Sequence, residues 1–443
     1  MKLLVQPQTT PLSGEISVPG DKSISHRAIM LASLAEGISE IRQWLPAGDT
    51  LATLAAFRDL GVKIDVGRKT PQAWDLTIEG RGLYGLEPPD RPLDCRNAGT
   101  CMRLMAGIMA GQRFPSVLDG SEQLRKRPMR RITGPLGEMG ANIADHDGRA
   151  PLHIQPAPLH GVEYEMKVAS AQVKSALLLA GLYAEGDTRI YQPGPARDHT
   201  ERMLQAMGLD IEAADSWISL RKGNGSGAIS LQPLDLTVPG DLSSAAFPLV
   251  AAAIVPHSKI RLNNIGFNKT RTGLLEIMQE MGVQFVVEAV RTTGGEPTAD
   301  LTIQFDEMHS TAVAGETVPR AIDEFPVWAV AATQAAGDST VRDAAELRVK
   351  EVDRISLLAG EMRKLGAKIS EQANGFTVHG PIRLEGGDVE SFGDHRLGMA
   401  LAVAGLVARQ ETVVHDAGCI ADSFPAFVET MQTLGANMAW VEE

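Results

Sequence analysis

Basic side chains recur where the sequence predicts that a helix begins. Lys22 and Arg27 flank the start of a helical pattern over 23–35, and Arg396 stands two residues into the helix that Asp394 opens. Cations are usually rare there, because the helix dipole already places partial positive charge at the N-terminus. Cationic side chains combined with free backbone N–H groups bind anions strongly. The sequence therefore predicts sites for phosphate or carboxylate groups at these helix ends.

Three further segments could contribute to such anion sites. In the segment 97–100, Gly99 would let the backbone approach a ligand closely. The basic run 125–131 is of a kind that usually indicates nucleic acid or a flexible surface. The segment 170–175 opens a very apolar helix with small hydroxyl groups that could cradle a phosphate, although Ser170 could equally be an ordinary helix N-cap.

The segment 348–354 forms another charged cluster. On a helix, Lys350 and Arg354 would share a face, and Glu351 could offset part of their repulsion. Alone, such a run is typical of a solvated, salt-bridged helix face. Beside the other clusters, an anion site is the stronger interpretation.

Charge and composition limit what these sites hold. The net charge of the 443 residues is -13, which argues against nucleic acid because that partner calls for a basic surplus. No nucleotide-binding loop and no close metal-ligand pairing of histidines is present in the sequence, so we expect no nucleotide and no metal. The three cysteines suit a reducing compartment. The first residues lack a secretory pattern and the apolar stretches are short, so we expect a cytoplasmic protein without membrane contact.

One pattern occurs six times along the chain: a helical segment ends in Leu or Met and is followed by Gly and an apolar residue. The six glycines are Gly61, Gly140, Gly208, Gly282, Gly366 and Gly435. Each stands where a helix C-cap is expected, because glycine adopts the left-handed conformation freely. Short strands follow, for example over 63–66 and 368–370. An earlier helix rich in Ala and Leu belongs to each unit, and the six begin near Ser23, Thr100, Ser170, Ser243, Asp323 and Asp394. This alternation predicts an α/β fold with helices packed under sheets.

The six units divide into two halves. The string Val-Pro-Gly-Asp-Lys-Ser at 18–23 returns as Val-Pro-Gly-Asp-Leu-Ser at 238–243, half a chain later. Val-Pro-Gly is a turn or hinge composition. We therefore predict hinge crossings near 19–22 and 238–241. They would separate an N-terminal domain over 21–239 from a C-terminal domain over 1–20 and 240–443, with three units in each.

Taken in order, these segments resemble the family of 5-enolpyruvylshikimate-3-phosphate synthases over essentially the whole chain. The matching motifs lie at 20–27, 97–103, 126–129, 170–172, 197–201, 322–324, 348–354 and 393–396. The motifs at 170–172 and 197–199 are similar to the class II branch of the family. The resemblance implies a two-domain, inverted α/β barrel-like fold with three βαβαββ-type units per domain and a hinged cleft. It also implies that no metal or organic cofactor is needed.

The resemblance implies that the chain joins phosphoenolpyruvate to the 5-hydroxyl of shikimate 3-phosphate and releases phosphate, on the way to chorismate and the aromatic amino acids. Shikimate 3-phosphate would be held by Lys22, Ser23, Arg27, Ser170, Ala171, Gln172, Arg197, Asp323 and Lys350. Phosphoenolpyruvate would be held by Lys22, Gly99, Arg127, Gln172, Arg354 and Arg396. In catalysis, Glu351 would transfer the proton at carbon, Asp323 would take the hydroxyl proton, and Lys22 would assist at the hydroxyl and the departing phosphate.

Asp422 and Gly99 affect the expected ligand contacts, and two other functions are alternatives. Asp422 stands where the better-known branch has a lysine, so that substrate contact is not carried over, and Gly99 leaves room for the inhibitor glyphosate, so we predict sensitivity to it. A sister enzyme that acts on UDP-N-acetylglucosamine would have Asn at position 23 and a Cys within 119–127, and this chain has neither. A non-enzymatic binding protein for phosphorylated metabolites would need the cations without Asp323 and Glu351. We expect the chain to act as a monomer.

Overall fold

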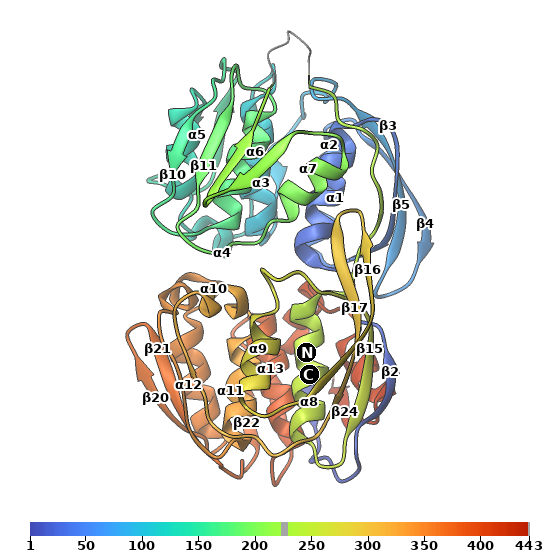
Figure 1. Ribbon diagram of the computed structural model, residues 1–443, viewed down its shortest axis with the longest axis vertical. Helices are drawn as coiled ribbons and strands as arrows, with labels where there is room; N and C mark the ends of the chain where they lie inside the picture. Colours follow the sequence, from blue (N-terminus) through green and yellow to red (C-terminus); the bar gives the residue numbers. More distant parts are fainter. Residues whose placement is uncertain (223–228, 442–443) are drawn as a thin grey trace. The chain divides into compact units, whose positions relative to one another are not determined.

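The computed structural model describes residues 1–222 and 229–441 (Figure 1). The chain forms two compact units. The N-terminal unit consists of Gly20–Val238 together with Thr292–Glu296, and the C-terminal unit consists of Met1–Pro19, Pro239–Arg291 and the chain from Pro297 onward. The chain thus passes between the units after Pro19, Val238, Arg291 and Glu296.

In the described part of the N-terminal unit, 20–222 and 229–238, the strands form three four-stranded sheets. Their strands are β3 (Glu36–Trp44), β4 (Lys63–Lys69), β5 (Trp74–Arg81), β6 (Leu93–Asp94), β7 (Ser116–Asp119), β8 (Asn142–Ala144), β9 (Leu152–Gln155), β10 (Glu163–Glu165), β11 (Thr188–Tyr191), β12 (Ile211–Ala214), β13 (Trp217–Leu220) and β14 (Asp235–Thr237). The strand orders are β14-β3-β5-β4, β6-β7-β9-β8 and β10-β11-β13-β12. In each sheet the first pairing is parallel and the next two are antiparallel.

The described residues of the C-terminal unit also form three four-stranded sheets, each with one parallel pairing at an edge. Its strands are β1 (Lys2–Val5), β2 (Ser13–Ile16), β15 (Lys259–Gly266), β16 (Phe285–Thr293), β17 (Glu296–Gln304), β18 (Ala312–Val313), β19 (Gly337–Val341), β20 (Lys368–Gln372), β21 (Gly375–Gly380), β22 (Gly387–Glu390), β23 (Thr412–His415) and β24 (Met438–Val441). The strand orders are β16-β17-β15-β2, β18-β19-β21-β20 and β22-β23-β1-β24. Strand β1 lies between β23 and β24, so the first residues of the chain complete the last sheet.

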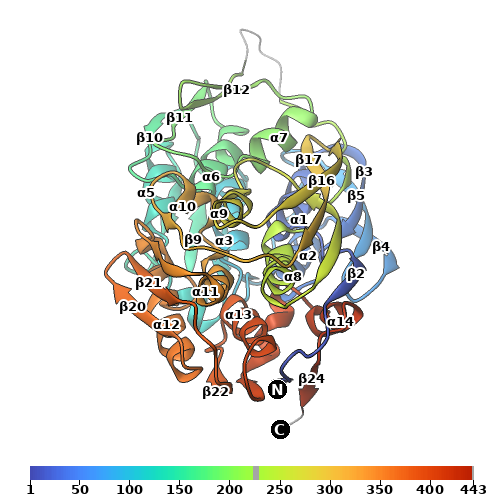
Figure 2. The same ribbon diagram turned by 60° about the horizontal axis from the view of Figure 1, so that its bottom comes forward.

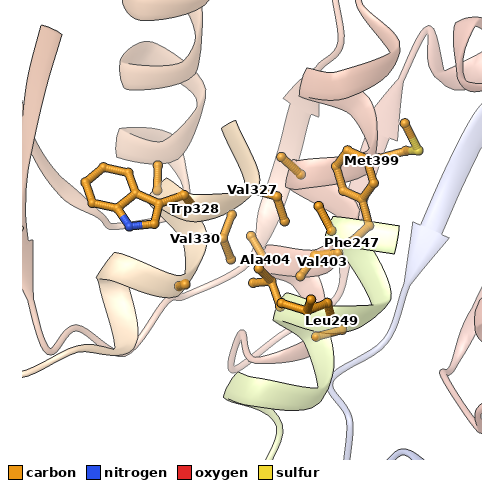
Figure 3. Close-up of a cluster of buried hydrophobic side chains, with 14 of the residues drawn as sticks. Phe247, Leu249, Val327, Trp328, Val330, Met399, Val403 and Ala404 are labelled. Atoms are coloured by element: carbon orange, nitrogen blue, oxygen red, sulfur yellow. The ribbon is translucent and has the colours of Figure 1, made fainter. Parts of the chain in front are cut away.

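Inner helices form the core of each unit. They are α1 (Lys22–Leu34), α3 (Gly99–Ala110) and α6 (Ala171–Gly181) in the N-terminal unit, and α8 (Leu242–Ile254), α11 (Phe325–Gln334) and α13 (His395–Leu406) in the C-terminal unit. Figure 2 shows the last three side by side. Figure 3 shows how their apolar side chains meet, for example Phe247, Val327 and Val403. Burial on all sides explains why α8 and α11 are apolar around almost their whole circumference. The inner helices of the N-terminal unit, in contrast, bury the charged side chains of Arg27, Arg103 and Lys174.

The remaining helices are shorter or lie further out. The outer helices are α2 (Gly48–Asp59), α5 (Arg130–Glu138), α7 (His199–Ala206), α9 (Gly273–Glu280), α12 (Arg354–Lys364) and α14 (Phe427–Thr433). The short ones are α4 (Glu122–Arg125), α10 (Thr317–Ala321) and the 3₁₀ helices η1 (Ala345–Val349) and η2 (Ala417–Asp422). Within 1–222 and 229–441, no helix has the length and apolar character needed to cross a bilayer.

The repeat glycines and the helix starts can be compared with the sequence predictions. All six glycines have φ between +82° and +102°, which confirms that each ends a helix in the left-handed conformation. The predicted caps Ser170 and Asp394 are confirmed, since their side chains accept backbone N–H groups of the helices that follow them. At α1 and α8 the caps are the aspartates Asp21 and Asp241, two residues before the predicted serines.

The hairpin between β16 and β17 departs from the predicted domain boundaries, which placed all of 240–443 in the C-terminal half. Its tip, Thr292–Glu296, belongs to the N-terminal unit. The reason is its contacts, because Arg202 donates a hydrogen bond to the carbonyl of Gly295 and the Glu296 carboxylate pairs with His199.

Candidate active site

The buried Arg27 holds together three helices of the N-terminal unit. From α1, its Nε donates to Thr200 Oγ1 on α7 at 2.7 Å, and its Nη2 donates to Ser175 Oγ on α6 at 2.8 Å. Its Nη1 donates to the carbonyl oxygen of Ser23 at 3.0 Å. Each of these partners is a neutral oxygen, so hydrogen bonds orient the guanidinium without a contacting carboxylate to cancel its charge.

The charge of Arg27 persists at neutral pH despite its burial. Burial lowers the pKa of Arg27 to about 10, and the carboxylates of Glu201 and Asp21 oppose that shift. The guanidinium therefore stays protonated and contributes positive potential at the start of α1.

Two more predicted residues lie at the same helix end. Arg197 Nη1 donates to Ser23 Oγ at 3.3 Å. Lys22 Nζ lies 2.5 Å from Asp49 Oδ2, and the Lys22 side chain is 16% exposed. Asp49 lies in the first turn of α2, so it holds the lysine head group in one place. A serine hydroxyl with an arginine and a lysine beside it suits a phosphate-bearing ligand.

Gln172 links the starts of α6 and α3. Its Oε1 accepts a hydrogen bond from Arg103 Nη1 at 2.8 Å, and its Nε2 donates to Thr100 Oγ1 at 3.0 Å. A methyl group on Gly99 would lie 2.8 Å from Arg103 Nη1 and 3.1 Å from Arg127 Nη1. The absence of a side chain at Gly99 therefore leaves room beside two guanidinium groups.

Ser170 and Ala171 stand one and two residues before Gln172. Ser170 caps α6 by accepting a hydrogen bond from the Val173 N–H at 3.4 Å. Ala171 is the first residue of the helix. The N-cap interpretation of Ser170 is thus confirmed, while its predicted contact with a substrate stays a prediction.

The second group of predicted residues lies in the C-terminal unit around Arg354, whose side chain is only 1% exposed. Its Nη2 donates to Glu351 Oε2 at 2.6 Å, its Nε donates to Asp394 Oδ2 at 2.8 Å, and its Nη1 lies 3.4 Å from Asp323 Oδ1. Burial alone would lower the pKa of Arg354, but the charges of Asp394, Glu351 and Asp323 raise it above its ordinary value. Arg354 is therefore a permanent cation inside a shell of carboxylates.

Asp323 also faces two further cations. Lys350 Nζ lies 3.5 Å from its Oδ1, and Arg396 Nη2 lies 3.8 Å from its Oδ2. The prediction that Lys350 and Arg354 share a helix face is wrong, because η1 ends at Val349 and α12 begins at Arg354. The two side chains converge on Asp323 instead, across the turn between these helices.

Comparisons with known proteins place the chain in a family. Residues 6–431 match the family model described as EPSP synthase (3-phosphoshikimate 1-carboxyvinyltransferase). The chain belongs to the EPSP synthase family. It is 49% identical over 429 residues to the 3-phosphoshikimate 1-carboxyvinyltransferase of Geobacter sp. (strain M21), covering 96% of this chain and 97% of that relative. It is 46% identical over 435 residues to the protein of that name from Bacillus cereus (strain B4264), covering 97% and 98%.

Solved structures agree with this assignment. The EPSP synthase from Acinetobacter baumannii matches with a TM-score of 0.88 and 41% identity, over 100% of both chains. The α/β enolpyruvyl transferase fold predicted from the sequence is therefore confirmed.

Within this EPSP synthase family member, sequence reasoning missed several supporting residues. Asp49 holds Lys22 in place, yet it reads locally as an ordinary polar residue on a helix. Ser175 and Thr200, which orient Arg27, lie within the segments 170–175 and 197–201 but were given no role of their own. Arg103 lies within the motif at 97–103 and was assigned to no substrate. Among the described residues, no group of three or more His, Cys, Asp or Glu side chains is arranged to hold a metal ion.

Proposed function

We propose that the chain transfers the enolpyruvyl group of phosphoenolpyruvate to the 5-hydroxyl of shikimate 3-phosphate and releases phosphate. The observation that supports this most directly is the family match over 6–431, which spans both groups of charged residues. In the addition step, the hydroxyl oxygen bonds to C2 of phosphoenolpyruvate, the hydroxyl proton is removed, and C3 gains a proton. In the elimination step, C3 loses a proton and the C2–O bond to phosphate breaks.

Shikimate 3-phosphate is assigned to the residues at the starts of α1 and α6. Ser23, Arg27 and Arg197 offer a hydroxyl and two guanidinium groups within one hydrogen-bonded set. Ser170, Ala171 and Gln172 add a hydroxyl, a helix N-terminus and an amide. Such donors suit a phosphate, because helix N-termini and guanidinium groups both supply directed N–H bonds. Asp323 and Lys350 complete the proposed set.

Phosphoenolpyruvate carries a carboxylate and a phosphate, so it needs cations from more than one side. Arg127 lies next to Gly99, and Gln172 contacts the neighbouring Arg103 and Thr100. Arg354 and Arg396 both contact Asp323. Bidentate guanidinium contacts match either anionic group, which supports the assignment of phosphoenolpyruvate to these residues and Lys22.

The proton transfers are assigned to carboxylates that cations hold in fixed positions. Asp323 would take the proton of the 5-hydroxyl, and Glu351 would carry the proton to and from C3. Arg354 contacts both carboxylates and so fixes their separation. Lys22, held by Asp49, would stabilise negative charge on the hydroxyl oxygen and the departing phosphate. Preorganised charges of this kind lower a barrier because they need no reorientation during the step.

The assignment uses residues from both units, so both units must act on the same substrates during turnover. We therefore propose that the crossings at the two Val-Pro-Gly strings serve as hinges and that substrate anions draw the units together. Small-angle scattering with and without shikimate 3-phosphate tests this, and an unchanged radius of gyration would contradict it.

A phosphate-release assay tests the proposed reaction. Release is expected with phosphoenolpyruvate and shikimate 3-phosphate together and not with either substrate alone. Replacing shikimate 3-phosphate by UDP-N-acetylglucosamine is expected to abolish release. Phosphate release from phosphoenolpyruvate with UDP-N-acetylglucosamine but not with shikimate 3-phosphate would support the activity of the sister enzyme. Binding of both proposed substrates without phosphate release would support a non-enzymatic binding protein.

A further inference from the structure

The tip of the β16–β17 hairpin is placed where it can act on the proposed shikimate 3-phosphate residues. Thr292–Glu296 belongs to the N-terminal unit, whereas the strands on either side of it belong largely to the C-terminal unit. Gly294 has a left-handed backbone, and a side chain there would lie 2.4 Å from Leu236 Cδ1. The tip is therefore closely seated on β14, and Thr293 Oγ1 also donates to the Thr237 carbonyl at 3.4 Å.

The strongest contact of the tip is a buried pair. The Glu296 carboxylate lies 2.7 Å from His199 Nδ1, and both side chains are 1% exposed. No other hydrogen-bond partner of the His199 ring occurs in 1–222 and 229–441, since its Nε2 is buried without one. Glu296 is therefore the group that orients this imidazole, and a charge-assisted hydrogen bond in a buried setting holds it firmly.

His199 is the first residue of α7, and Arg202 in the same turn donates to the Gly295 carbonyl at 3.1 Å. The hairpin tip thus forms hydrogen bonds with two residues in the first turn of α7. The residue between them, Thr200, accepts the hydrogen bond of Arg27 Nε at 2.7 Å and lies 2.7 Å from Ser175 Oγ. A shift of this turn would move Thr200 and release Arg27 from its fixed orientation.

The segment before α7 completes the connection. Arg197 stands two residues before His199 and donates to Ser23 Oγ at 3.3 Å. Arg27, Arg197 and Ser23 are therefore all anchored to, or next to, the turn that Glu296 fixes. Glu296, which follows the second Val-Pro-Gly string in the sequence, thereby supports Ser23 and Arg27 near the first string.

We propose that Glu296, acting through His199 and the first turn of α7, is a positioning residue for the shikimate 3-phosphate site. The inference rests on the proposed function and adds to it a residue that does not touch the substrate. It explains why the hairpin tip lies in the N-terminal unit. It also means that the C-terminal stretch of chain helps to set the affinity of the N-terminal unit for its substrate.

The test compares Glu296→Gln with Glu288→Gln, which makes the same change on β16, where Glu288 is exposed and pairs with Arg261. Titration calorimetry would measure the binding of shikimate 3-phosphate alone to the full chain. Glu296→Gln is expected to weaken binding by about tenfold, because the buried charge-assisted hydrogen bond is replaced by a weaker neutral one. Glu288→Gln is expected to bind like the parent chain.

Steady-state kinetics separates positioning from a general loss of stability. For Glu296→Gln, the KM for shikimate 3-phosphate should rise by about tenfold, with kcat and the KM for phosphoenolpyruvate within about twofold of the parent. Parental affinity in the folded Glu296→Gln variant would overturn the inference, even if its melting temperature fell. His199→Asn keeps an N–H donor toward Glu296 and is expected to lose less affinity than His199→Leu; equal affinities in these two variants would also overturn it.

A measurement on the parent chain covers the case in which the variants fail to fold. Coupling between two sites is reciprocal, so shikimate 3-phosphate must stabilise the hairpin tip if the tip stabilises its site. Amide hydrogen exchange in 292–296 is expected to slow by at least about threefold on addition of shikimate 3-phosphate. Unchanged exchange there would overturn the inference. Failure of the parent chain to release phosphate from the two substrates would instead count against the proposed function.

Discussion

The two Val-Pro-Gly-Asp-x-Ser strings, at 18–23 and 238–243, occupy equivalent places in the two units. Each leads into a buried inner helix, and in each the aspartate caps that helix. Asp21 accepts the N–H of Ile24 at 2.9 Å, and Asp241 accepts the N–H of Ser243 at 2.9 Å. Beyond the cap, the two strings have different surroundings.

The polar side chains of the second string form hydrogen bonds with other side chains of the C-terminal unit. Arg271 Nη2 donates to Asp241 Oδ1 at 2.8 Å and to Ser243 Oγ at 2.6 Å. The Ser243 hydroxyl in turn donates to Glu324, and Leu242 packs in the core. Every one of these side chains is buried, so the cation at this helix start already has its anion in the protein.

The first string buries Asp21 but leaves its two other polar side chains partly exposed. Lys22 takes the place of Leu242, and Lys22 and Ser23 are only partly buried. Arg27 is oriented by hydroxyl and carbonyl oxygens rather than by a contacting carboxylate. The comparison shows that a repeated backbone can carry cations with different surroundings. Arg271 is buried against Asp241, whereas Lys22 pairs with Asp49 while partly exposed and is proposed to bind the substrates. The following substitutions test that contrast, from the largest expected effect to the smallest.

Lys22→Ala should lower kcat/KM by about 10³-fold, because it removes the cation that we propose to act at the reacting oxygens. Its unfolding midpoint should barely change, since the side chain is partly exposed. Leu242→Ala at the equivalent position should do the reverse, costing about 3 kcal/mol of stability while each folded molecule keeps its activity. Phosphate release and urea unfolding measure the two effects, and full activity in Lys22→Ala would break the comparison.

Asp323→Asn should reduce kcat by about 10²-fold while both substrates still bind, because the amide cannot accept the hydroxyl proton. The adjacent Glu324 accepts a hydrogen bond from Ser243 of the second string, so Glu324→Gln should lower stability and leave kcat within about threefold of the parent. Rapid-quench kinetics and equilibrium binding distinguish the two. Equal losses of kcat in both variants would contradict a catalytic role for Asp323 beside a structural role for Glu324.

Arg271→Met should destabilise the chain by about 3 kcal/mol, because Asp241 would remain buried without its cation. Urea unfolding followed by tryptophan fluorescence would report it. The KM values of the folded variant should match those of the parent. A variant as stable as the parent would mean that the second string is not held by this charge cluster.

Gly99→Ala should raise the KM for phosphoenolpyruvate by about tenfold, since the new methyl group would crowd Arg103 and Arg127. The inhibition constant for glyphosate, to which the parent is predicted to be sensitive, should rise further. The fold should tolerate the change because only the ends of long side chains must move. Gly20→Ala in the first string is the contrast, since its methyl group would lie 2.2 Å from the Gln43 carbonyl oxygen and should cost stability.

Asp353→Ala measures how much an aspartate helix cap outside both strings contributes to stability. Asp353 caps α12, and its loss should cost about 1 kcal/mol. Burial would raise the pKa of Asp353, but the Ser356 N–H and the Arg348 guanidinium lower it below its ordinary value. Its contribution is therefore complete above the unfolded pKa of about 3.9 and disappears as the pH falls through the lower folded pKa. Urea midpoints of parent and variant should converge below about pH 4, and a constant gap would contradict this.

The sequence by itself determined the repeated architecture and the chemical character of the site. Gly61, Gly366 and the other repeat glycines signal helix ends because a left-handed C-cap is a local backbone requirement, readable from a few neighbouring residues. The cations at 22–27 and 348–354 predict anion binding through their type and spacing, and this prediction is part of the proposed function. The same local logic failed over 348–354, where the chain turns between η1 and α12 instead of continuing as one helix.

Only the tertiary structure decided which groups hold these cations. Arg27 is oriented by Thr200, 173 residues away, and by Ser175, 148 residues away. The partner of Glu296 is His199, 97 residues before it. Hydrogen bonds over such separations leave no periodic trace in the sequence, because they depend on how sheets and helices pack rather than on local conformation. For the same reason, the two similar strings could be recognised from sequence as a pair, while their opposite surroundings could not.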